Sequence, residues 1–600
     1  MEYIQCLNGE NLYGSFISGA REVIKNKNAL NDINVFPVAD RDTGTNLAST
    51  MNYIIEESKI DKTAKSTMSS IADAALLGAR GNSGIIMAQY INGMFMSLNE
   101  EEEITISGFA ESIQNAFPHA YNSISDPVEG TMITVIREWA QAVYNKKDTS
   151  MDFYDLLGQP LEVAFKSLEE TTSKLKVLQR SKVVDSGAKG FVHFIQGFTE
   201  FIKTGKVAEV SEIVEEIHSF HEMDHRDGNI EHRYCTEAML TCENIDLNIL
   251  KEKLKDQGDS LIVAGNNTKA RIHVHTNTPE KIFQILRQEG NIIQQKVDDM
   301  KRQYQAAFDR KYNIALVTDS IADLPEEIMD KYQIHLLPLN LVMEGTSYLD
   351  KRTMTAEIFY DILDDLEEYP SSAQPSPKVI EHLYSSLLEN YDEILVISVA
   401  KEQSGTNNLF QQAAKKMARS GKIIRVIDSK QNSGAEGLLV MKAAEMIHNG
   451  ESLDNIIQEI EFLRDRTQIL VSVNTLKYMV RSGRLSKAGG VLGKLINLKP
   501  VVSLDEKGAG SIADMAFSIN SNTKKIMNRM KRYNENNKIT RYAIVHANNP
   551  VRAEEYRRKC VEILNCEPEY IMNISTIVGI SAGVGSVAVA YMSERGVNNG

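Results

Sequence analysis

Apolar residues recur at different spacings along this chain of 600 residues, and the change of spacing divides it into blocks. Up to about residue 205 the spacing is that of amphipathic helices, and the alternation typical of strands is scarce. A representative set is Leu12, Phe16, Ala20, Val23 and Ile24. We predict an all-helical domain over residues 1–205 and a charged, histidine-containing linker over residues 206–230.

The pattern becomes mixed over residues 231–310. Short apolar runs at residues 261–264 and 270–275 predict strands, whereas residues 279–289 have the spacing of a helix. We therefore expect a small α+β domain between the linker and the last block.

Apolar strands alternate with helical stretches throughout residues 311–600. The predicted strands are 314–317, 334–339, 394–399, 423–427 and 469–473. This alternation predicts an α/β region with a doubly wound parallel sheet. With a second α/β subdomain in the same block, the expected fold class is multidomain: an all-α domain, a small α+β domain and an α/β region.

Charge and hydropathy narrow the function classes. The formal net charge is −15, which argues against a duplex nucleic acid partner, because such a partner requires a basic surface. The sequence contains no apolar run of about 18 residues and no charged-then-apolar leader, so we expect neither a membrane span nor a secretion signal. A cytoplasmic protein, with at most transient contact with a membrane surface, is the expectation.

The segment 40–46 carries the most specific chemistry. Two carboxylates (Asp40 and Asp42), two hydroxyls and the Asn46 amide surround Gly44. Carboxylate and amide oxygens are ligands of Mg²⁺, which proteins commonly bind together with nucleotide phosphates. The segment thus indicates phosphoryl transfer, although the same residue types also form polar turns.

A second segment, 78–84, is a glycine-rich loop that leads into an apolar stretch of helical spacing beginning at Ile85. This order places backbone amides at a helix N-terminus, where the amides and the helix dipole bind phosphate. Glycine-rich loops before helices are common and most bind nothing, so the signal gains weight from the neighbouring metal segment.

These segments resemble a known family. Residues 34–46 are similar to the signature of the DhaL-like domain of bacterial fatty acid kinases, and residues 78–84, 128–137 and 183–190 match its further motifs in order. The resemblance implies a helical barrel that holds ATP with two Mg²⁺ ions, with Asp40 and Asp42 as catalytic metal ligands and Asn34 as a third ligand. It also implies an ATP-binding set comprising Thr43, Thr45, Asn46, Gly81, Asn82, Ser83, Gly84, Thr131 and Asp185. A homodimer through the kinase domain is a further expectation.

One position departs from that family, because Arg41 stands where the family usually has Gly. If the glycine is needed for a positive φ angle or for close approach of the metal, Arg41 lowers activity. If it is not, the guanidinium can contact a phosphate.

In the middle block, His273 and His275 are two apart on a predicted strand and therefore project from one face, while Cys235 lies in another strand-like segment. A thiolate and two imidazoles form a possible Zn²⁺ set with one open position, although such histidine pairs are more often surface residues. Residues 234–237 and 273–277 resemble the middle domain of the same kinase family, whose Cys and two His are associated with zinc. The role of this site, structural or catalytic, stays open.

The last block resembles the DegV family of fatty-acid-binding proteins along nearly its whole length, through residues 317–325, 371–376, 404–406, 483–486 and 495–500. An apolar acid needs an apolar tunnel and a carboxylate clamp of hydroxyls and a cation. Ser372, Ser404 and Arg484 are our candidates for that clamp, the alternative being two turn residues and a surface cation. The wider binding set is Gln374, Gly405, Thr406 and Ser581.

Ser581 is also a departure, because the DegV family usually has a His there. A hydroxyl can hydrogen-bond a carboxyl group but carries no charge near neutral pH. Either fatty acid binding is altered, or another group such as His546 compensates.

Two resemblances in one chain suggest consecutive parts of one reaction, since a tether raises the effective concentration of the acceptor. The expected activity transfers the γ-phosphoryl group of ATP to a fatty acid carboxylate and yields acyl phosphate, a substrate for a downstream acyltransferase. The alternatives are a non-catalytic fatty-acid-binding protein with a decayed nucleotide site, suggested by Arg41 and Ser581, and a small-molecule kinase of the dihydroxyacetone (glycerone) type.

Overall fold

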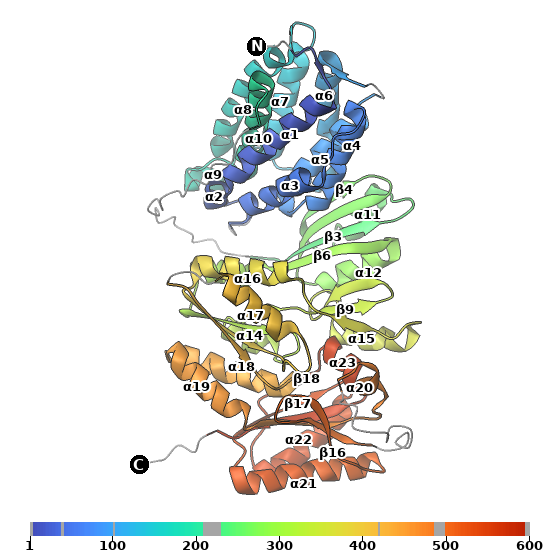
Figure 1. Cartoon of the computed structure of the whole chain (residues 1–600), viewed down its shortest axis with the longest axis vertical. Coiled ribbons are helices and arrows are strands. Elements are labelled where there is room, and N and C mark those ends of the chain that lie inside the picture. Colours follow the sequence, from blue (N-terminus) through green and yellow to red (C-terminus); the bar gives the residue numbers. More distant parts are fainter. Residues whose placement is uncertain are drawn as a thin grey trace. The chain divides into compact units, whose positions relative to one another are not determined.

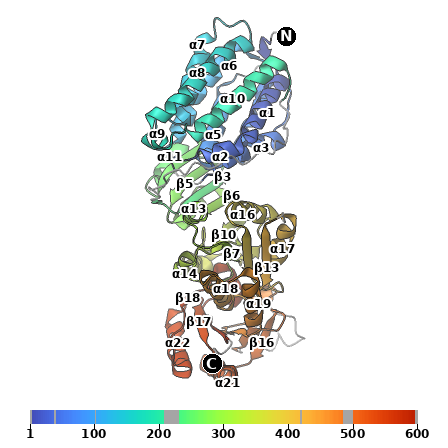
Figure 2. The ribbon, with the colours of Figure 1, turned by 90° about the vertical axis from the view of Figure 1, so that its left-hand side faces the viewer.

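The structure is a computed structural model that describes residues 4–37, 41–99, 102–207, 230–417, 421–484 and 499–594. Asp40, most of the predicted linker and residues 485–498 therefore lie outside the described residues. The chain forms two compact units, Met1–Gln303 and Tyr304–Gly600, each of which is described by itself (Figures 1 and 2). None of the described helices is long and apolar enough to cross a membrane.

The first unit begins with the predicted helices, shown in blue and teal in Figure 1. They are α1 (Gly9–Lys25), α2 (Lys27–Asp32), α3 (Thr43–Glu57), α4 (Ala64–Gly78), α5 (Gly81–Ser97), α6 (Ile106–Ser123), α7 (Met132–Lys146), α8 (Phe153–Lys174), α9 (Lys176–Ser181) and α10 (Ser186–Thr204). The two-residue strands β1 (Cys6–Leu7) and β2 (Ile104–Thr105) pair antiparallel beside them.

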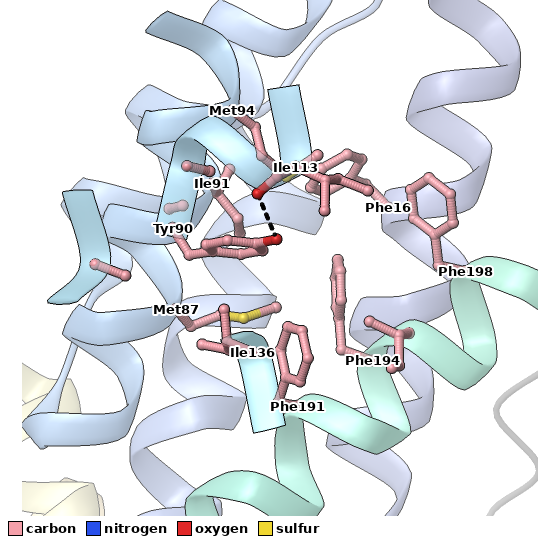
Figure 3. Close-up of a cluster of buried hydrophobic side chains, with 14 of the residues drawn as sticks. Phe16, Met87, Tyr90, Ile91, Met94, Ile113, Ile136, Phe191, Phe194 and Phe198 are labelled. Carbon is pink, nitrogen blue, oxygen red and sulfur yellow. Dashed lines mark hydrogen bonds between the residues drawn. The ribbon is translucent and has the colours of Figure 1, made fainter. Parts of the chain in front are cut away.

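Aromatic rings fill the centre of this helical domain (Figure 3). Phe16 of α1 meets Phe194 and Phe198 of α10 edge-on, with ring centroids 5.5 Å apart in both pairs. The hydroxyl of Tyr90 on α5 donates to the Ile113 carbonyl oxygen of α6 at 3.0 Å, so this ring is buried without an unpaired polar atom. The apolar stripe predicted for the first helix is confirmed, because four of its five residues are buried: Leu12, Phe16, Ala20 and Val23.

The middle block folds into an antiparallel sheet of strand order β4-β5-β3-β6. Its elements are β3 (Tyr234–Thr241), α11 (Leu247–Leu254), β4 (Asp259–Gly265), β5 (Lys269–Thr276), α12 (Pro279–Glu289), β6 (Asn291–Asp299) and α13 (Met300–Phe308). Both predicted strands and the predicted helix of this block are confirmed.

This sheet packs directly on helix α5 of the barrel. Ile262 and Ala264 of β4 belong to the same buried apolar cluster as the barrel core. The Gly265 amide donates to Gln89 Oε1 at 2.8 Å, and Asn92 Nδ2 donates to the Gly265 carbonyl oxygen at 3.2 Å. Barrel and middle sheet consequently share one hydrophobic core.

The second unit contains the predicted parallel sheet, with strand order β13-β12-β7-β8. Its strands are β7 (Ile314–Asp319), β8 (His335–Leu337), β12 (Glu393–Ser398) and β13 (Ile423–Asp428). The helices of this part are α14 (Glu326–Lys331), α15 (Ala356–Ile362), α16 (Pro377–Asn390), α17 (Thr406–Met417) and α18 (Ser433–His448). A small antiparallel sheet of β9 (Asn340–Met343), β10 (Thr346–Leu349) and β11 (Ser371–Ala373) belongs to the same unit, and the 3₁₀ turn η1 (Leu363–Asp365) follows α15 in the sequence.

A second, six-stranded sheet has the order β16-β15-β14-β19-β17-β18. Its strands are β14 (Thr467–Ser472), β15 (Val501–Leu504), β16 (Gly510–Asp514), β17 (Arg541–His546), β18 (Ile571–Asn573) and β19 (Val587–Met592). The accompanying helices are α19 (Leu453–Arg464), α20 (Lys477–Arg481), α21 (Ile519–Asn537), α22 (Pro550–Leu564) and α23 (Thr576–Ala582).

The placement of one strand differs from the prediction. The segment 469–473 was expected in the parallel sheet, but β14 lies in the six-stranded sheet, antiparallel to β15 and β19. A central strand covered on both faces is a continuous apolar run in either kind of sheet, so the pattern cannot distinguish them. The two α/β parts that the sequence predicts are otherwise present.

Candidate functional site

Four helices of the barrel begin at the four sequence motifs, and contacts join these helix N-termini. A Cβ built on Gly81, the first residue of α5, would lie 2.3 Å from Asn46 Nδ2 of α3. A Cβ built on Gly187 of α10 would lie 2.5 Å from Ser83 Oγ of α5. Because helix N-termini carry partial positive charge and free amides, their meeting point suits a polyphosphate.

Asp185 links the N-termini of α7 and α10 through hydrogen bonds. Its Oδ2 accepts hydrogen bonds from the Ala188 amide at 2.8 Å and from the Met132 amide, at the start of α7, at 3.1 Å. Burial raises the pKa of this carboxyl to about 6, against the opposing effect of the two amides. Thr131, which precedes α7, donates its hydroxyl to the Val128 carbonyl oxygen at 2.7 Å.

In the first motif, several residues are held by the barrel itself. Asn31 on α2 accepts from the Thr45 amide and donates to the Thr45 hydroxyl, both at 3.0 Å. A Cβ on Gly44 would lie 2.1 Å from the Lys27 carbonyl oxygen, so this glycine allows α3 to approach α2. Asn34 and Thr43 are buried nearby in the sequence, and Asp42 precedes α3 without a side-chain capping hydrogen bond.

Arg41 has a left-handed backbone, with φ at 58°. Its guanidinium pairs with Asp32 Oδ1 at 2.5 Å. A residue with a Cβ is disfavoured in this conformation, so the glycine usual in the family fits the backbone at this position better than Arg41 does.

The three predicted zinc ligands lie together in the middle sheet. Cys235 on β3 and His275 on β5 are direct cross-strand partners. Cys235 Sγ lies 3.7 Å from His273 Nδ1, and the two Nε2 atoms of His273 and His275 lie 3.2 Å apart. All three side chains are buried, and one possible ligand atom from each lies within 4.8 Å of the others. One thiolate and two imidazoles in this spacing fit a Zn²⁺ ion.

Asp42, in the first motif of the barrel, has a small electrostatic influence on this cluster. Burial is the largest influence on both Cys235 and His273, raising the pKa of the thiol and lowering that of the imidazole. The Asp42 carboxylate raises both pKa values as a smaller effect.

Sequence reasoning gave no role to Glu237, Arg80 and Arg271, which connect the cluster to the glycine-rich loop at residues 78–84. Glu237 is buried on β3, and Arg271 is buried on the neighbouring strand β5. Arg271 donates to Glu237 Oε2 at 2.8 Å, and Arg80 of the glycine-rich loop lies 3.3 Å from the same atom. The available signal was spacing, since Glu237 follows Cys235 by two residues and so projects from the same face of its strand.

A pocket lies on one face of the six-stranded sheet in the second unit. Its apolar lining includes Ile469, Val471, Val502, Leu504, Val545 and Ala588. Ile469 and Val471 face the pocket because successive residues of β14 point to opposite faces of the sheet. Leu470, which lies between them, packs against α21 and α22 on the other face. The polar lining includes Gln403, Asn432, Ser433, Arg484, His546 and Ser581.

Two members of the proposed carboxylate clamp are in contact, because Arg484 donates from a terminal nitrogen to Ser372 Oγ at 3.0 Å. Burial lowers the pKa of the Arg484 guanidinium. Ser581 lines the same pocket as Arg484, and so does His546, the compensating group considered above.

The other predicted residues form a neighbouring group. Ser404 and Thr406 share a hydrogen bond between their hydroxyls at 2.8 Å. A Cβ on Gly405 would lie 2.3 Å from Gln374 Nε2, which places that amide against the turn. Next to this turn, Gln403 lines the pocket, and sequence reasoning had not singled it out.

Three family profiles match successive parts of the chain. The DAK2 domain profile matches residues 37–200, and the profile of the FakA-like middle domain of fatty acid kinase matches residues 231–307. The DegV family, described as uncharacterised protein, matches residues 313–594. These matches define the class: a kinase-like helical domain and an α/β DegV domain.

The chain therefore carries a DAK2 (DhaL-like) domain, a FakA-like middle domain and a DegV domain in one polypeptide, which confirms the resemblance found in the sequence. These three domains follow one another in the order that the sequence resemblance predicts.

Two curated relatives similar to this chain are described as uncharacterised proteins. One from Staphylococcus epidermidis is 32% identical over 314 residues, covering 50% of this chain and 57% of the relative. One from Staphylococcus aureus strain USA300 is 33% identical over 323 residues, covering 52% of this chain and 59% of the relative. The chain thus matches less than two thirds of the length of these relatives.

Solved structures similar to this chain include two DegV proteins. A fatty acid binding DegV family protein from Streptococcus agalactiae has a TM-score of 0.44 and 24% identity, with 47% of this chain and 100% of that chain covered. DegV from Bacillus subtilis, described as a fatty acid binding protein, has a TM-score of 0.44, 26% identity and the same two coverages.

Proposed function

We propose that the chain is a fatty acid kinase in one polypeptide, which transfers the γ-phosphoryl group of ATP to a fatty acid carboxylate. The observation that carries the proposal is the meeting of the N-termini of α3, α5, α7 and α10 in a DAK2 domain. Four partially positive helix ends suit a triphosphate better than any neutral ligand.

In the barrel, the phosphates would contact the first turn of α5. The Asn82 Oδ1 atom there is buried and has no hydrogen-bond partner among the described residues. Ser83 presents its hydroxyl between α5 and α10. Asp42, together with Asp40, would hold the Mg²⁺ ions, which when bound neutralise phosphate charge. Zn²⁺ is proposed for Cys235, His273 and His275.

The acceptor needs no general base. A fatty acid carboxyl has a pKa of about 4–5, as carboxyl groups in water do, so it is ionised at pH 7. Its oxygen attacks the γ-phosphorus, the bond from that phosphorus to the β,γ-bridging oxygen breaks, and ADP leaves with the electron pair. Catalysis then consists of alignment and charge neutralisation.

Arg484 and Ser372 would hold that carboxylate, because a cation and a hydroxyl in contact form an anion site at an apolar pocket. The apolar lining of β14 and its neighbours would hold the acyl chain. Ser581 and His546 are both available at the same pocket, so the serine that replaces the usual histidine does not leave the site without an imidazole.

The deciding experiment measures ADP release from Mg²⁺·ATP with and without oleate, with hydroxylamine present to trap acyl phosphate as a hydroxamate. We expect oleate-dependent ADP release and hydroxamate formation. Asp42→Asn and Asp40→Asn should abolish both, because each removes a metal-binding charge, yet retain binding of a fluorescent fatty acid.

Arg484→Gln is the matched variant on the acceptor side. It should weaken fatty acid binding while nucleotide binding is retained, since Arg484 lies in the second unit, away from the four helix ends in the sequence. Tight fatty acid binding by the unmodified protein without any ADP release would contradict the kinase proposal and support a binding protein.

The DAK2 match also favours one other candidate, a small-molecule kinase of the dihydroxyacetone type. Replacing oleate with dihydroxyacetone in the same assay decides between them. ADP release that depends on dihydroxyacetone and not on oleate would establish that alternative.

A further inference from the structure

Glu237 lies where the two sites of the first unit meet. Its side chain is 1% exposed, and both oxygens are engaged. Oε1 accepts from the Gly81 amide, at the start of α5, at 2.6 Å. Oε2 accepts from Arg271 at 2.8 Å and lies 3.3 Å from Arg80. The residue thus binds the phosphate loop across 156 positions of sequence.

The same carboxylate faces the metal cluster. Glu237 Oε1 lies 3.7 Å from His273 Nδ1, while His273 Nε2 faces His275 Nε2 at 3.2 Å. His275 has an equivalent carboxylate behind it, because Asp259 Oδ1 lies 3.4 Å from its Nδ1. In each histidine a carboxylate lies near Nδ1, and such a partner orients the other ring nitrogen, Nε2, toward a metal.

We propose that Glu237 is a positioning residue that couples two binding events, and this inference rests on the proposed function. The two events are metal binding at Cys235, His273 and His275 and nucleotide binding at the N-terminus of α5. One oxygen atom serves both sites, being 2.6 Å from the Gly81 amide and 3.7 Å from His273. If Oε1 of Glu237 moves toward His273, its hydrogen bond with the Gly81 amide changes, and a movement toward Gly81 changes its distance from His273.

The charges around Glu237 explain how a ligand at one site affects the other site. Arg271 is 0% exposed and fixes Oε2, so the carboxylate has little freedom to move as a whole. A cation at the imidazoles attracts the carboxylate, whereas a triphosphate at the helix end competes with it for the positive N-terminus of α5. Each ligand therefore alters the affinity for the other, and thermodynamic linkage makes the effect reciprocal.

The test titrates Co²⁺ into the full-length, metal-free protein, with and without the magnesium complex of a non-hydrolysable ATP analogue. Thiolate-to-cobalt absorption reports ligation by a cysteine, and Cys235 is the cysteine of the candidate cluster. In the unmodified protein we expect the nucleotide to change the Co²⁺ dissociation constant by about fivefold or more. Glu237→Gln should still bind both ligands, but the nucleotide should change its Co²⁺ affinity less than about twofold.

Asp259→Asn is the matched control, because Asp259 lies behind His275 and pairs with His232 rather than with the phosphate loop. It should weaken Co²⁺ binding by about tenfold or more and keep the full nucleotide-induced change. Glu237→Asp is a second variant, since it retains the charge beside Arg271 but is too short to reach both sites.

Equal nucleotide effects in Glu237→Gln and the unmodified protein, or no effect in the unmodified protein, would overturn the coupling. If Glu237→Gln does not fold, by circular dichroism, the same criteria apply to Glu237→Asp. The measurement needs only binding. Coupling without acyl phosphate formation would therefore contradict the proposed reaction alone, whereas absence of nucleotide binding would contradict both.

Discussion

At the scale of single residues, burial and hydrogen bonding shift the pKa of the Asp185 carboxyl group in opposite directions. Two backbone amides stabilise its charged form, but its burial between α7 and α10 is the larger effect and raises the pKa to about 6 from 3.8. The folded barrel consequently binds this proton more tightly than the unfolded chain does. The contribution of the Asp185 carboxyl group to the stability of the folded protein is complete below about pH 4. It is lost as the pH rises through 6.

Asp185→Asn should therefore be more stable than the unmodified protein at pH 8 and nearly equal to it at pH 4. A shift from 3.8 to about 6 corresponds to a difference of up to about 3 kcal/mol. The asparagine oxygen can accept the same two amides without a charge. Unfolding by urea, followed by the fluorescence of Trp139, reports the barrel, because this is the one tryptophan of the chain. A stability difference that stays constant with pH would be inconsistent with this explanation.

Two variants of Arg41 distinguish the effect of its charge on stability from the effect of its left-handed backbone. Both variants lose the ion pair with Asp32, but Arg41→Gly removes the left-handed strain, whereas Arg41→Ala keeps it. We expect the glycine variant to be more stable than the alanine variant by about 1 kcal/mol, measured by urea unfolding. If the guanidinium contacts phosphate, both variants should lose nucleotide affinity equally.

Residue types gave the ligand candidates, but their partners could not be predicted. Cys235, His273 and His275 were found from strand spacing and resemblance, and the structure brings them together. Glu237 has its decisive contact with Gly81, which is far away in the sequence. Buried ion pairs between distant segments leave no periodic signal, so only the folded arrangement shows them.

At the scale of elements, Tyr90 fastens α5 to α6. Tyr90→Phe removes the hydrogen bond to the Ile113 carbonyl oxygen while retaining the ring. We expect a loss of about 1 kcal/mol in the free energy of unfolding, from urea titration with Trp139 fluorescence. Tyr154→Phe, on the exposed side of α8, is the control and should leave stability unchanged. Equal losses in the two variants would rule out a specific role for the buried hydroxyl.

Helices and strands were predicted from periodicity, but their neighbours were not. The five strand segments of the last block exist, yet β14 belongs to the antiparallel part of the second sheet. Local pattern reports burial on one or both faces of a strand, while pairing depends on contacts with β15 and β19, which come later in the chain. Element type was thus accessible from the sequence and sheet membership was not.

At the scale of the whole molecule, the chain joins two units through a segment that can be cut. A protease site inserted between Arg310 and Lys311 would follow α13 and precede β7. If the tether supplies the acceptor, turnover per enzyme should be independent of protein concentration before cleavage and should fall on dilution after it. ADP release at several protein concentrations measures this. Identical dilution behaviour before and after cleavage would argue against a role for the tether.

The domain boundaries set by composition remain predictions, but the first unit adds what composition could not show. Barrel and middle sheet share one core through Ile262 and Ala264, although the chain between them changes character. A change of periodicity marks a change of secondary structure. It does not show whether the two parts fold as separate bodies.

The four helix ends have a further consequence for the motions of the barrel. First-turn amides that no side chain accepts open to solvent more easily than the aromatic core of the barrel does (Figure 3). In deuterated water, those amides would exchange early in the nucleotide-free protein. The Gly81 amide, already bonded to Glu237, would exchange late. A nucleotide bound there as proposed would protect these turns, so its concentration would determine how long an opened barrel stays exposed to proteases.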